Sequence, residues 1–277
     1  MMEGVASLLI LVSGFAHAIV NAILKSGKDK MSGRALIDGF SAVLVAPAAV
    51  LLPLPAHAWG WLAASWAVHL VYLFTLIKSF EESELTVAYP IARGVAPVLA
   101  ATAAVAFFHA PITTPVVLGI AGSAGGVLCI GISHTMNGKG LLWAVITGAC
   151  IAAYTVIDAQ GVRAAPTAWS YIVWVFIFLG GGIGVFFALW RGRAFLLAAA
   201  TQWKPGLAAG ALSILTYGLA LWAFRLGSIP RLAALRETSI LFATAIAVIF
   251  LKERLTRVRK IGVAAIALGA MALVASG

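Results

Sequence analysis

Several ionisable side chains of this sequence lie inside long apolar stretches, where a charge needs water or a partner. Arg93, Asp158, Arg236 and Glu237 occupy such positions, and His17 lies in the first apolar stretch. A charge at the centre of a membrane-spanning helix costs about 2.5–3.5 kcal/mol on insertion scales. We therefore expect these side chains to face a wet cavity, where arginine binds anions, and a carboxylate or histidine contacts an amine or carries a proton.

Each of these residues also has a structural interpretation. Arg93 would extend toward the membrane surface from a helix bent at Pro90 and Pro97, which cannot donate backbone hydrogen bonds. Glu237 would form a buried ion pair with a cation on another helix, for which Arg93 is one possibility. Asp158 ends its apolar stretch and would be a solvated carboxylate there, and His17 would only donate or accept a hydrogen bond.

The elements that position these side chains are ten apolar stretches, each close to the 20 or so residues that cross a bilayer as a helix. The chain of 277 residues is 62% hydrophobic and 10% charged, which excludes a soluble fold. The predicted fold is an all-α integral membrane protein with ten transmembrane helices. The predicted spans are Gly4–Leu24, Gly33–Leu54, Trp59–Ser79, Glu84–Phe108, Thr113–Ser133, Gly140–Asp158, Ala168–Trp190, Pro205–Phe224, Ile229–Leu251 and Val258–Ser276.

Glycine pairs at helical spacing permit close helix packing: Gly122/Gly126, Gly180/Gly184 and Gly206/Gly210.

The basic residues between the spans are divided unevenly between the two membrane sides. Fourteen of the 19 lie on one side and three, Arg163, Arg225 and Arg231, on the other. The positive-inside rule therefore predicts that the first side is cytoplasmic and that both termini lie outside. The same confinement to short loops explains the net charge of +10 without a nucleic-acid partner.

The polar residues repeat between the two halves of the chain, which we predict to be five-helix repeats over residues 1–136 and 137–277. Since five is odd, the second repeat would be inverted in the membrane, an arrangement typical of transporters. The corresponding positions are His17 with Tyr154, Asn21 with Asp158, Tyr72 with Tyr217, and Arg93 with Arg236.

Four stretches resemble the EamA-like branch of the drug/metabolite transporter superfamily: His17-Ala18-x-x-Asn21-x-x-x-Lys25, Tyr89-Pro90-Ile91-Ala92-Arg93-Gly94, Leu235-Arg236-Glu237-Thr238-Ser239 and Leu251-Lys252-Glu253-Arg254-Leu255. The resemblance implies two inverted repeats, a central cavity and alternating access, often for export. Relatives generally place both termini in the cytoplasm, opposite to the charge count. The Tyr-Pro-x-x-Arg-Gly sequence is also similar to membrane proteins associated with phosphonate use, which implies an anionic or zwitterionic substrate.

We therefore predict a secondary transporter of small zwitterionic or anionic metabolites, amino-acid-like or organophosphorus, in the inner membrane, as a monomer or homodimer. It would need no cofactor or metal, with a proton as a possible coupled ion. A lipid flippase or scramblase is the alternative, favoured by a groove open sideways to lipid, and an intramembrane enzyme is a third hypothesis. The predicted substrate-binding residues are His17, Asn21, Tyr72, Tyr89, Arg93, Tyr154, Asp158, Tyr217, Trp222, Arg236 and Glu237.

The charge count predicts the orientation of the C-terminus. A reporter that is active only in the cytoplasm, fused after Gly277, should be inactive, because the basic loops hold the opposite membrane side inside. A reporter that is active only outside should be active at the same position. Strong cytoplasmic activity would overturn this orientation without bearing on the number of helices.

Overall fold

The apolar stretches form helices, since a helix satisfies its backbone hydrogen bonds within one segment even in hydrocarbon. The computed structural model describes residues 2–26, 30–83, 85–131, 137–249, 252 and 255–276, and no strand occurs in these ranges. Eight of the described segments are long and apolar enough to cross a membrane. The prediction of an all-helical membrane protein is confirmed.

The helices follow one another with short connections. The first half of the chain contains α1 (Met2–Ser26), α2 (Lys30–Val45), α3 (Ala48–Leu51), α4 (Trp59–Glu82), α5 (Leu85–Phe108) and α6 (Thr114–Gly131). The second half contains α7 (Gly138–Ala164), α8 (Ala168–Phe176), the π-helical η1 (Ile177–Gly181), α9 (Gly182–Arg191), α10 (Arg193–Leu226), α11 (Ile229–Leu235), the 3₁₀ turn η2 (Arg236–Thr238), α12 (Ser239–Ile249) and α13 (Arg257–Ala275).

Two of the ten expected spans are not among the eight long apolar segments. The expected span 113–133 corresponds to α6, whose apolar part, Thr114–Ile130, is shorter than the others. The expected span 229–251 is divided into α11, η2 and α12. By contrast, α5 continues as one helix through Pro90 and Pro97, so these prolines do not unwind it.

The expected spans 168–190 and 205–224 leave residues 191–204 outside any helix, which is wrong, because this segment is helical on both sides of Gly192. Gly192, at φ +50°, makes the turn that only glycine adopts without strain, and α10 begins at the next residue. The alanines at 198–200 favour helix. With 34 residues, α10 is about 50 Å long at 1.5 Å per residue, which exceeds the roughly 30 Å of hydrocarbon. Its first turns therefore extend beyond the hydrocarbon core.

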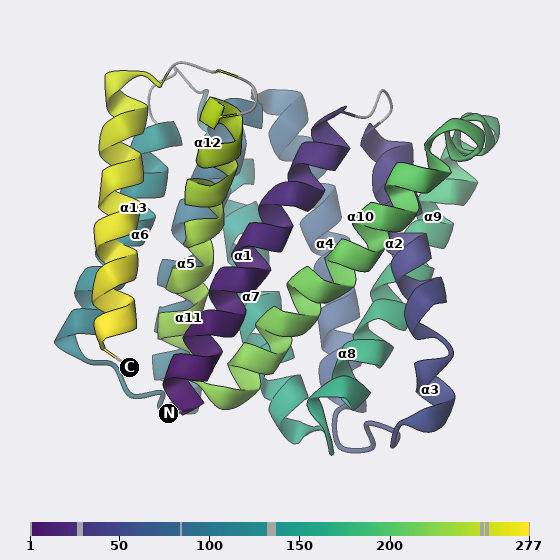
Figure 1. Cartoon of the computed structure of the whole chain (residues 1–277), viewed down its shortest axis with the longest axis horizontal. Coiled ribbons are helices and arrows are strands. Elements are labelled where there is room, and N and C mark those ends of the chain that lie inside the picture. Colours follow the sequence, from purple (N-terminus) through teal and green to yellow (C-terminus); the bar gives the residue numbers. More distant parts are fainter. Residues whose placement is uncertain are drawn as a thin grey trace.

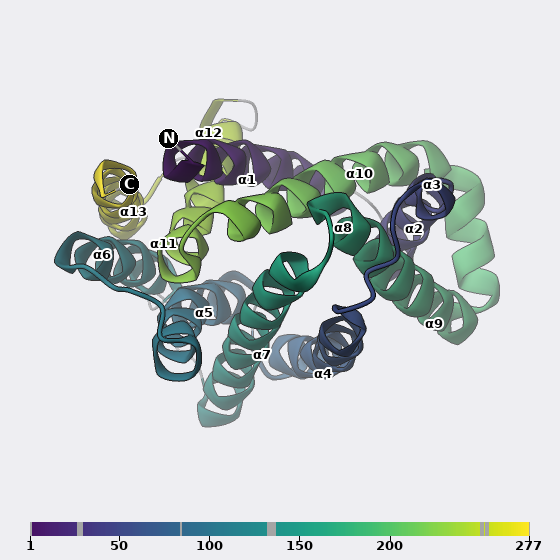
Figure 2. The same cartoon turned by 90° about the horizontal axis from the view of Figure 1, so that it is seen from below.

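The helices pack in extensive pairs that join the two halves of the chain. The largest contacts are α6 with α13, α7 with both α4 and α5, and α10 with both α1 and α2. Figure 1 shows α1 beside α10 and both chain ends at the same end of the molecule, and Figure 2 shows α6 beside α13. The main buried core lies between α1, α7, α8, α10 and α11, and includes Tyr171, Leu221, Phe224 and Leu232.

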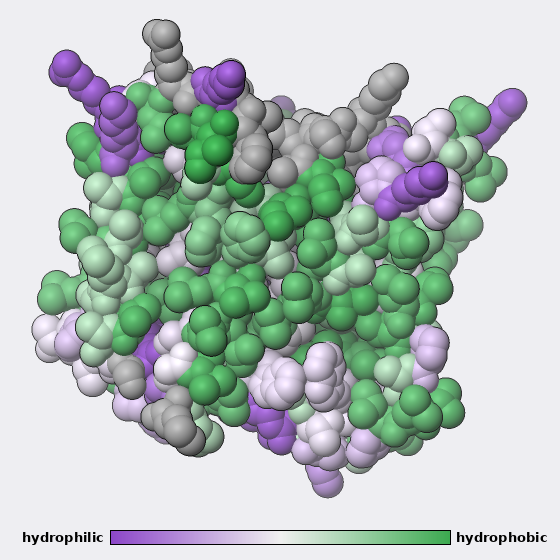
Figure 3. Space-filling view, in the orientation of Figure 1, coloured by the Kyte–Doolittle hydropathy of each residue, from purple (hydrophilic) through white to green (hydrophobic). Residues whose placement is uncertain are grey.

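The outer surface has the pattern of a membrane protein. Figure 3 shows hydrophobic side chains over the middle of one face and hydrophilic side chains along its upper and lower edges. Large apolar side chains such as Val43, Leu189 and Leu268 are more than 60% exposed on the same molecule. Such exposure is stable where lipid replaces water as the solvent.

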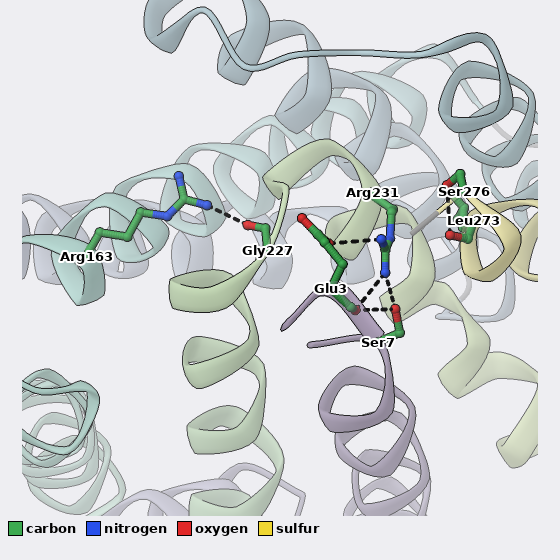
Figure 4. A network of polar contacts seen from close by, with 7 residues as sticks. All are labelled: Glu3, Ser7, Arg163, Gly227, Arg231, Leu273 and Ser276. Atoms are coloured by element: carbon green, nitrogen blue, oxygen red, sulfur yellow. Dashed lines mark hydrogen bonds and ion pairs between the residues drawn. The ribbon is translucent and has the colours of Figure 1, made fainter. Parts of the chain in front are cut away.

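Near the N-terminus, two arginines hydrogen-bond to neighbouring segments and hold α7, α10 and α11 together (Figure 4). Arg163 donates to the carbonyl oxygens of Phe224 and Gly227, at 2.9 and 2.6 Å. Arg231 pairs with the Glu3 carboxylate at 2.9 Å and donates to Ser7. The Phe224 and Gly227 carbonyl oxygens lie at the end of α10, beyond the reach of donors of that helix, so Arg163 supplies the missing donors.

Arg225 has the same role on the other side of this junction. It donates to the carbonyl oxygens of Val162, Ala165 and Pro166 at the end of α7. Arg163 and Arg225 therefore cap the ends of α10 and α7, whereas Arg231 joins α11 to Glu3 and Ser7 of α1.

Glycines allow α6 and α13 to touch through their backbones. A Cβ atom built on Gly126 would lie 2.5 Å from the Gly262 carbonyl oxygen, and one built on Gly262 would lie 2.6 Å from the Gly126 carbonyl oxygen. No side chain fits at either position without moving a helix. The close packing expected from the Gly122/Gly126 spacing is confirmed, and we call this contact the glycine seam.

The seam predicts opposite effects at two adjacent glycines. Gly126→Ala should destabilise the protein by about 1–3 kcal/mol, because the methyl group meets backbone that cannot move aside. Gly125→Ala is the matched control, since a Cβ there meets nothing within 4 Å and alanine favours helix by up to about 1 kcal/mol. Thermal unfolding in detergent measures both, and equal melting temperatures would contradict the seam.

Candidate functional site

A break in the helix places Glu237 opposite Arg93 of α5. Between α11 and α12 the chain forms the 3₁₀ turn η2, where the Thr238 hydroxyl donates to the Leu235 carbonyl oxygen at 2.8 Å. This side-chain bond competes with the helical pattern and favours a local break. Gly14 of α1 packs beside the turn, where a Cβ built on it would make an ordinary contact with the Ser239 nitrogen at 3.4 Å.

Arg93 and Glu237 form a buried ion pair. Their nearest atoms, Nε and Oε2, are 3.2 Å apart, and the side chains are 6% and 4% exposed. Arg93 also donates from Nη2 to the Ser239 hydroxyl at 3.2 Å. The possibility that Glu237 pairs with Arg93 is confirmed, so this arginine does not extend toward the membrane surface. The two charges largely neutralise each other.

Asp158 lies deep in the protein and receives two tyrosine hydroxyls. It is 0% exposed, and it accepts hydrogen bonds from Tyr171, at 2.7 Å, and from Tyr217. The prediction that the helix ends at Asp158 is wrong, since α7 continues to Ala164, where Arg225 satisfies its last carbonyls. The alternative of a solvated carboxylate at a helix end is therefore excluded.

Tyr217 connects Asp158 to Arg236. Its hydroxyl donates to the carboxylate, and the Arg236 guanidinium lies over its ring at 5.4 Å from the centroid. Within the described part of the chain, neither Asp158 nor Arg236 has an oppositely charged group within ion-pairing distance. A negative and a positive charge thus flank one aromatic side chain, each without an ionic partner.

The other predicted side chains surround this arrangement. Tyr72 packs edge-on against Tyr154, with ring centroids 5.7 Å apart. Arg93 and Arg236 both lie close enough to His17 and Tyr154 for their charges to act on them. The site thus brings together side chains from α1, α4, α5, α7, α10 and η2.

Five of the predicted side chains at the site are only partly buried. His17, Tyr72, Tyr217 and Arg236 face this interior cluster yet are neither fully buried nor fully exposed. Tyr89 is also partly exposed and lies within electrostatic range of Arg93. The site thus combines partly exposed side chains with the buried Asp158 and the buried Arg93–Glu237 pair.

Two predicted residues lie at its periphery. Asn21 is partly buried on α1, one helical turn from His17. Trp222 packs edge-on against Trp169 at the start of α8, with centroids 5.2 Å apart. It lies beyond Tyr217 along α10, toward the end of the helix.

The sequence analysis missed four polar residues of this region: Arg34, Asp38, His69 and Tyr171. His69 stacks on Tyr154 with centroids 4.2 Å apart, and Arg34 donates to Asp38 on α2 at 2.8 Å. The available signal was the i,i+4 spacing of Arg34 and Asp38 at the start of an apolar stretch. Tyr171 gave no such signal, because a lone tyrosine in an apolar run is also an ordinary core residue.

A family model described as the EamA-like transporter family matches residues 138–275. The chain belongs to the EamA-like transporter family. The match covers the half of this EamA-like chain that contains Tyr154, Asp158, Tyr217, Arg236 and Glu237. Members of this family are membrane transporters, and the apolar helices make this one a multi-pass membrane protein.

Comparison with solved structures supports the fold but says nothing about function. A solved structure titled only "Crystal structure of protein" is similar to the chain with a TM-score of 0.73, over 98% of this chain and 95% of that one, at 14% sequence identity. A search of curated proteins finds no match. The EamA-like assignment therefore rests on the family match, and the fold is shared along almost the whole chain.

The different surroundings of the two arginines predict different effects of their removal. Arg93→Ala should destabilise the protein by about 3–5 kcal/mol, because Glu237 would remain buried without its cation. Arg236→Ala should cost about 1 kcal/mol or less, since a partly exposed cation–π contact is lost. Denaturant unfolding in detergent measures both variants.

The double variant Arg93→Met with Glu237→Met is the control, and it should recover much of the lost stability because it buries no charge. Equal destabilisation by the two single variants would contradict the ion-pair assignment.

Proposed function

We propose that this chain is a secondary transporter that moves small zwitterionic metabolites across the inner membrane by alternating access, in the direction of export. Asp158 and Arg236, which flank Tyr217 with opposite and unpaired charges, carry this proposal. A zwitterion would satisfy both charges at once and add none of its own. The flippase alternative has no specific observation in its favour.

The two inverted repeats, 1–136 and 137–277, are part of the same proposal. Helix α1 packs on α10 as α7 packs on α4, and α6 pairs with α13, which are the contacts that a pseudo-twofold relation between five-helix repeats requires. Both chain ends lie at the same end of the molecule, as an even number of crossings demands (Figure 1). The family match over residues 138–275 supports a boundary near residue 137.

The chemistry of binding follows from exposure. Arg236 is partly exposed and would bind the anionic group directly through its planar fork of donors. Asp158 is fully buried behind Tyr217, so the ammonium group would contact the hydroxyl oxygen of Tyr217 while the carboxylate stabilises it from behind. Asp158 is thus a positioning residue, and with Glu237 a candidate carrier of a coupled proton.

The total charge of the region agrees with a neutral substrate. Arg93 and Glu237 neutralise each other, as do Arg34 and Asp38, which leaves Arg236 and Asp158. A substrate with a net charge would leave an uncompensated charge in a membrane interior, whereas a zwitterion would not.

Removing the charge of Arg236 or of Asp158 should change which substrates the protein prefers. In Arg236→Gln the affinity for a zwitterion should fall about ten- to a hundredfold, because a charge-assisted hydrogen bond contributes about 1.5–3 kcal/mol. Asp158→Asn should weaken a zwitterion similarly but strengthen binding of an acid without an amine, since Arg236 then acts unopposed. A zwitterion found by thermal-shift screening, with its acid-only and amine-only analogues, provides the measurement.

Arg193→Gln is the matched control, because Arg193 is exposed at the start of α10 and should leave all three affinities unchanged. Flux in proteoliposomes under an imposed pH gradient then tests the coupled proton. Unchanged affinity for the zwitterion in both Arg236→Gln and Asp158→Asn would refute the proposed site.

A further inference from the structure

Arg34 is a charged residue near the start of a predicted membrane span, and it is not buried. It belongs to α2, within the apolar segment Ser32–Leu51. Its side chain is 48% exposed, whereas that of its ion-pair partner Asp38 is 10% exposed. A half-exposed guanidinium on a spanning helix must face either lipid or water, and lipid is the costly choice.

The packing of α2 directs Arg34 inward. Helix α10 approaches α2 at the Ile37 carbonyl, and α9 approaches it at the Ala35 carbonyl. At about 100° per residue, Arg34 lies on the helix face between these two contacts. Val43 lies on the opposite face, where it is 67% exposed as a lipid-facing residue should be.

The groups across from Arg34 belong to the candidate site. The charge of Arg34 acts on Tyr72 of α4, Tyr154 of α7 and His17 of α1. Tyr154 is also within range of Arg236. Arg34 therefore lies within electrostatic range of the candidate site, at the end of α2 that follows α1 (Figure 1).

Asp38 orients the Arg34 guanidinium through Nε only, which leaves the two terminal Nη groups without a described hydrogen-bond partner. Asp38 accepts a hydrogen bond from Nε at 2.8 Å, and within the described part of the chain neither Nη atom of Arg34 makes a hydrogen bond. Taken as a whole residue, Asp38 is 7% exposed, and Gly180 of η1 packs against its backbone carbonyl. The fixed carboxylate thus orients the guanidinium and leaves its two terminal amino groups for an incoming acceptor.

We propose that Arg34 is a second oxyanion-binding position, which holds the carboxylate, phosphonate or phosphate group of a substrate at the loop end of the path to Arg236. Asp38 is its positioning residue. The pathway role rests on the proposed transport function, whereas the binding of an oxyanion at Arg34 does not. The three arginines would then have different roles: Arg93 is buried against Glu237, whereas the half-exposed Arg34, whose charge Asp38 balances, and the partly exposed Arg236 would each take the anionic group in turn.

Chemical modification tests the proposal on the intact protein. Phenylglyoxal reacts with accessible guanidinium groups, and mass spectrometry of peptides gives the rate at each arginine. Arg34 should react, and inorganic phosphate should slow its reaction several-fold without changing the rate at exposed Arg193. Failure of Arg34 to react, or reaction at the same rate with and without phosphate, would overturn the proposal.

A second variant tests the role of Asp38. In Asp38→Asn, Arg34 should remain reactive while the protection by phosphate falls several-fold, because the guanidinium is no longer oriented. Glu81→Gln is the matched control, since it breaks the exposed Lys78–Glu81 pair on α4 and should leave protection unchanged. Unchanged protection in Asp38→Asn would remove the positioning role.

The two proposals fail separately in these experiments. Protection of Arg34 by phosphate without any zwitterion binding at Arg236 would refute the transport proposal and keep the oxyanion position. Zwitterion binding at Arg236 without protection of Arg34 would refute the oxyanion position and keep the transport proposal.

Discussion

A charge inside the hydrocarbon region is stable only beside an opposite charge, a set of hydrogen-bond donors, or water, and the interior of this protein is arranged around that constraint. Arg93 has Glu237, Asp158 has two tyrosine hydroxyls, and Arg34 has Asp38. Arg34 and Asp38 lie one turn apart on α2, but Glu237 and Tyr217 come from segments far along the chain from the charges they contact. For Arg93 and Asp158, correct helix packing is therefore a condition for burying the charge, and the satisfied charge in turn favours that packing.

The sequence was most informative where the lipid environment acts on single residues. Apolar length predicted the helices, and the cost of buried charge selected Arg93, Asp158, Arg236 and Glu237 as interior groups. What could not be predicted depends on contacts between helices. The 3₁₀ turn at η2 contains Glu237, which pairs with Arg93 of α5, and the end of α7 beyond Asp158 is capped by Arg225 of α10. Hydropathy does not contain this information.

The two arginines that the proposed repeat pairs do not have the same surroundings. Arg93 lies on a continuous helix that contains two prolines, yet Arg236 lies at a break in a segment without an interior proline. One is neutralised by a carboxylate and the other lies on a tyrosine ring. In the proposed repeat, one arginine would serve stability and the other would be left for binding, because a single substrate has no twofold symmetry to match.

The glycine seam has a consequence for how the protein is made. It joins α6 of the first half of the chain to α13 of the second half, so the contact between Gly126 and Gly262 can form only after α13 has entered the membrane. Before that, α6 can already pack on α5, which precedes it, but its glycine face lacks the helix that covers it in the folded protein. A variant in which α13 fails to insert would therefore leave this glycine face to lipid while the contact between α5 and α6 remains.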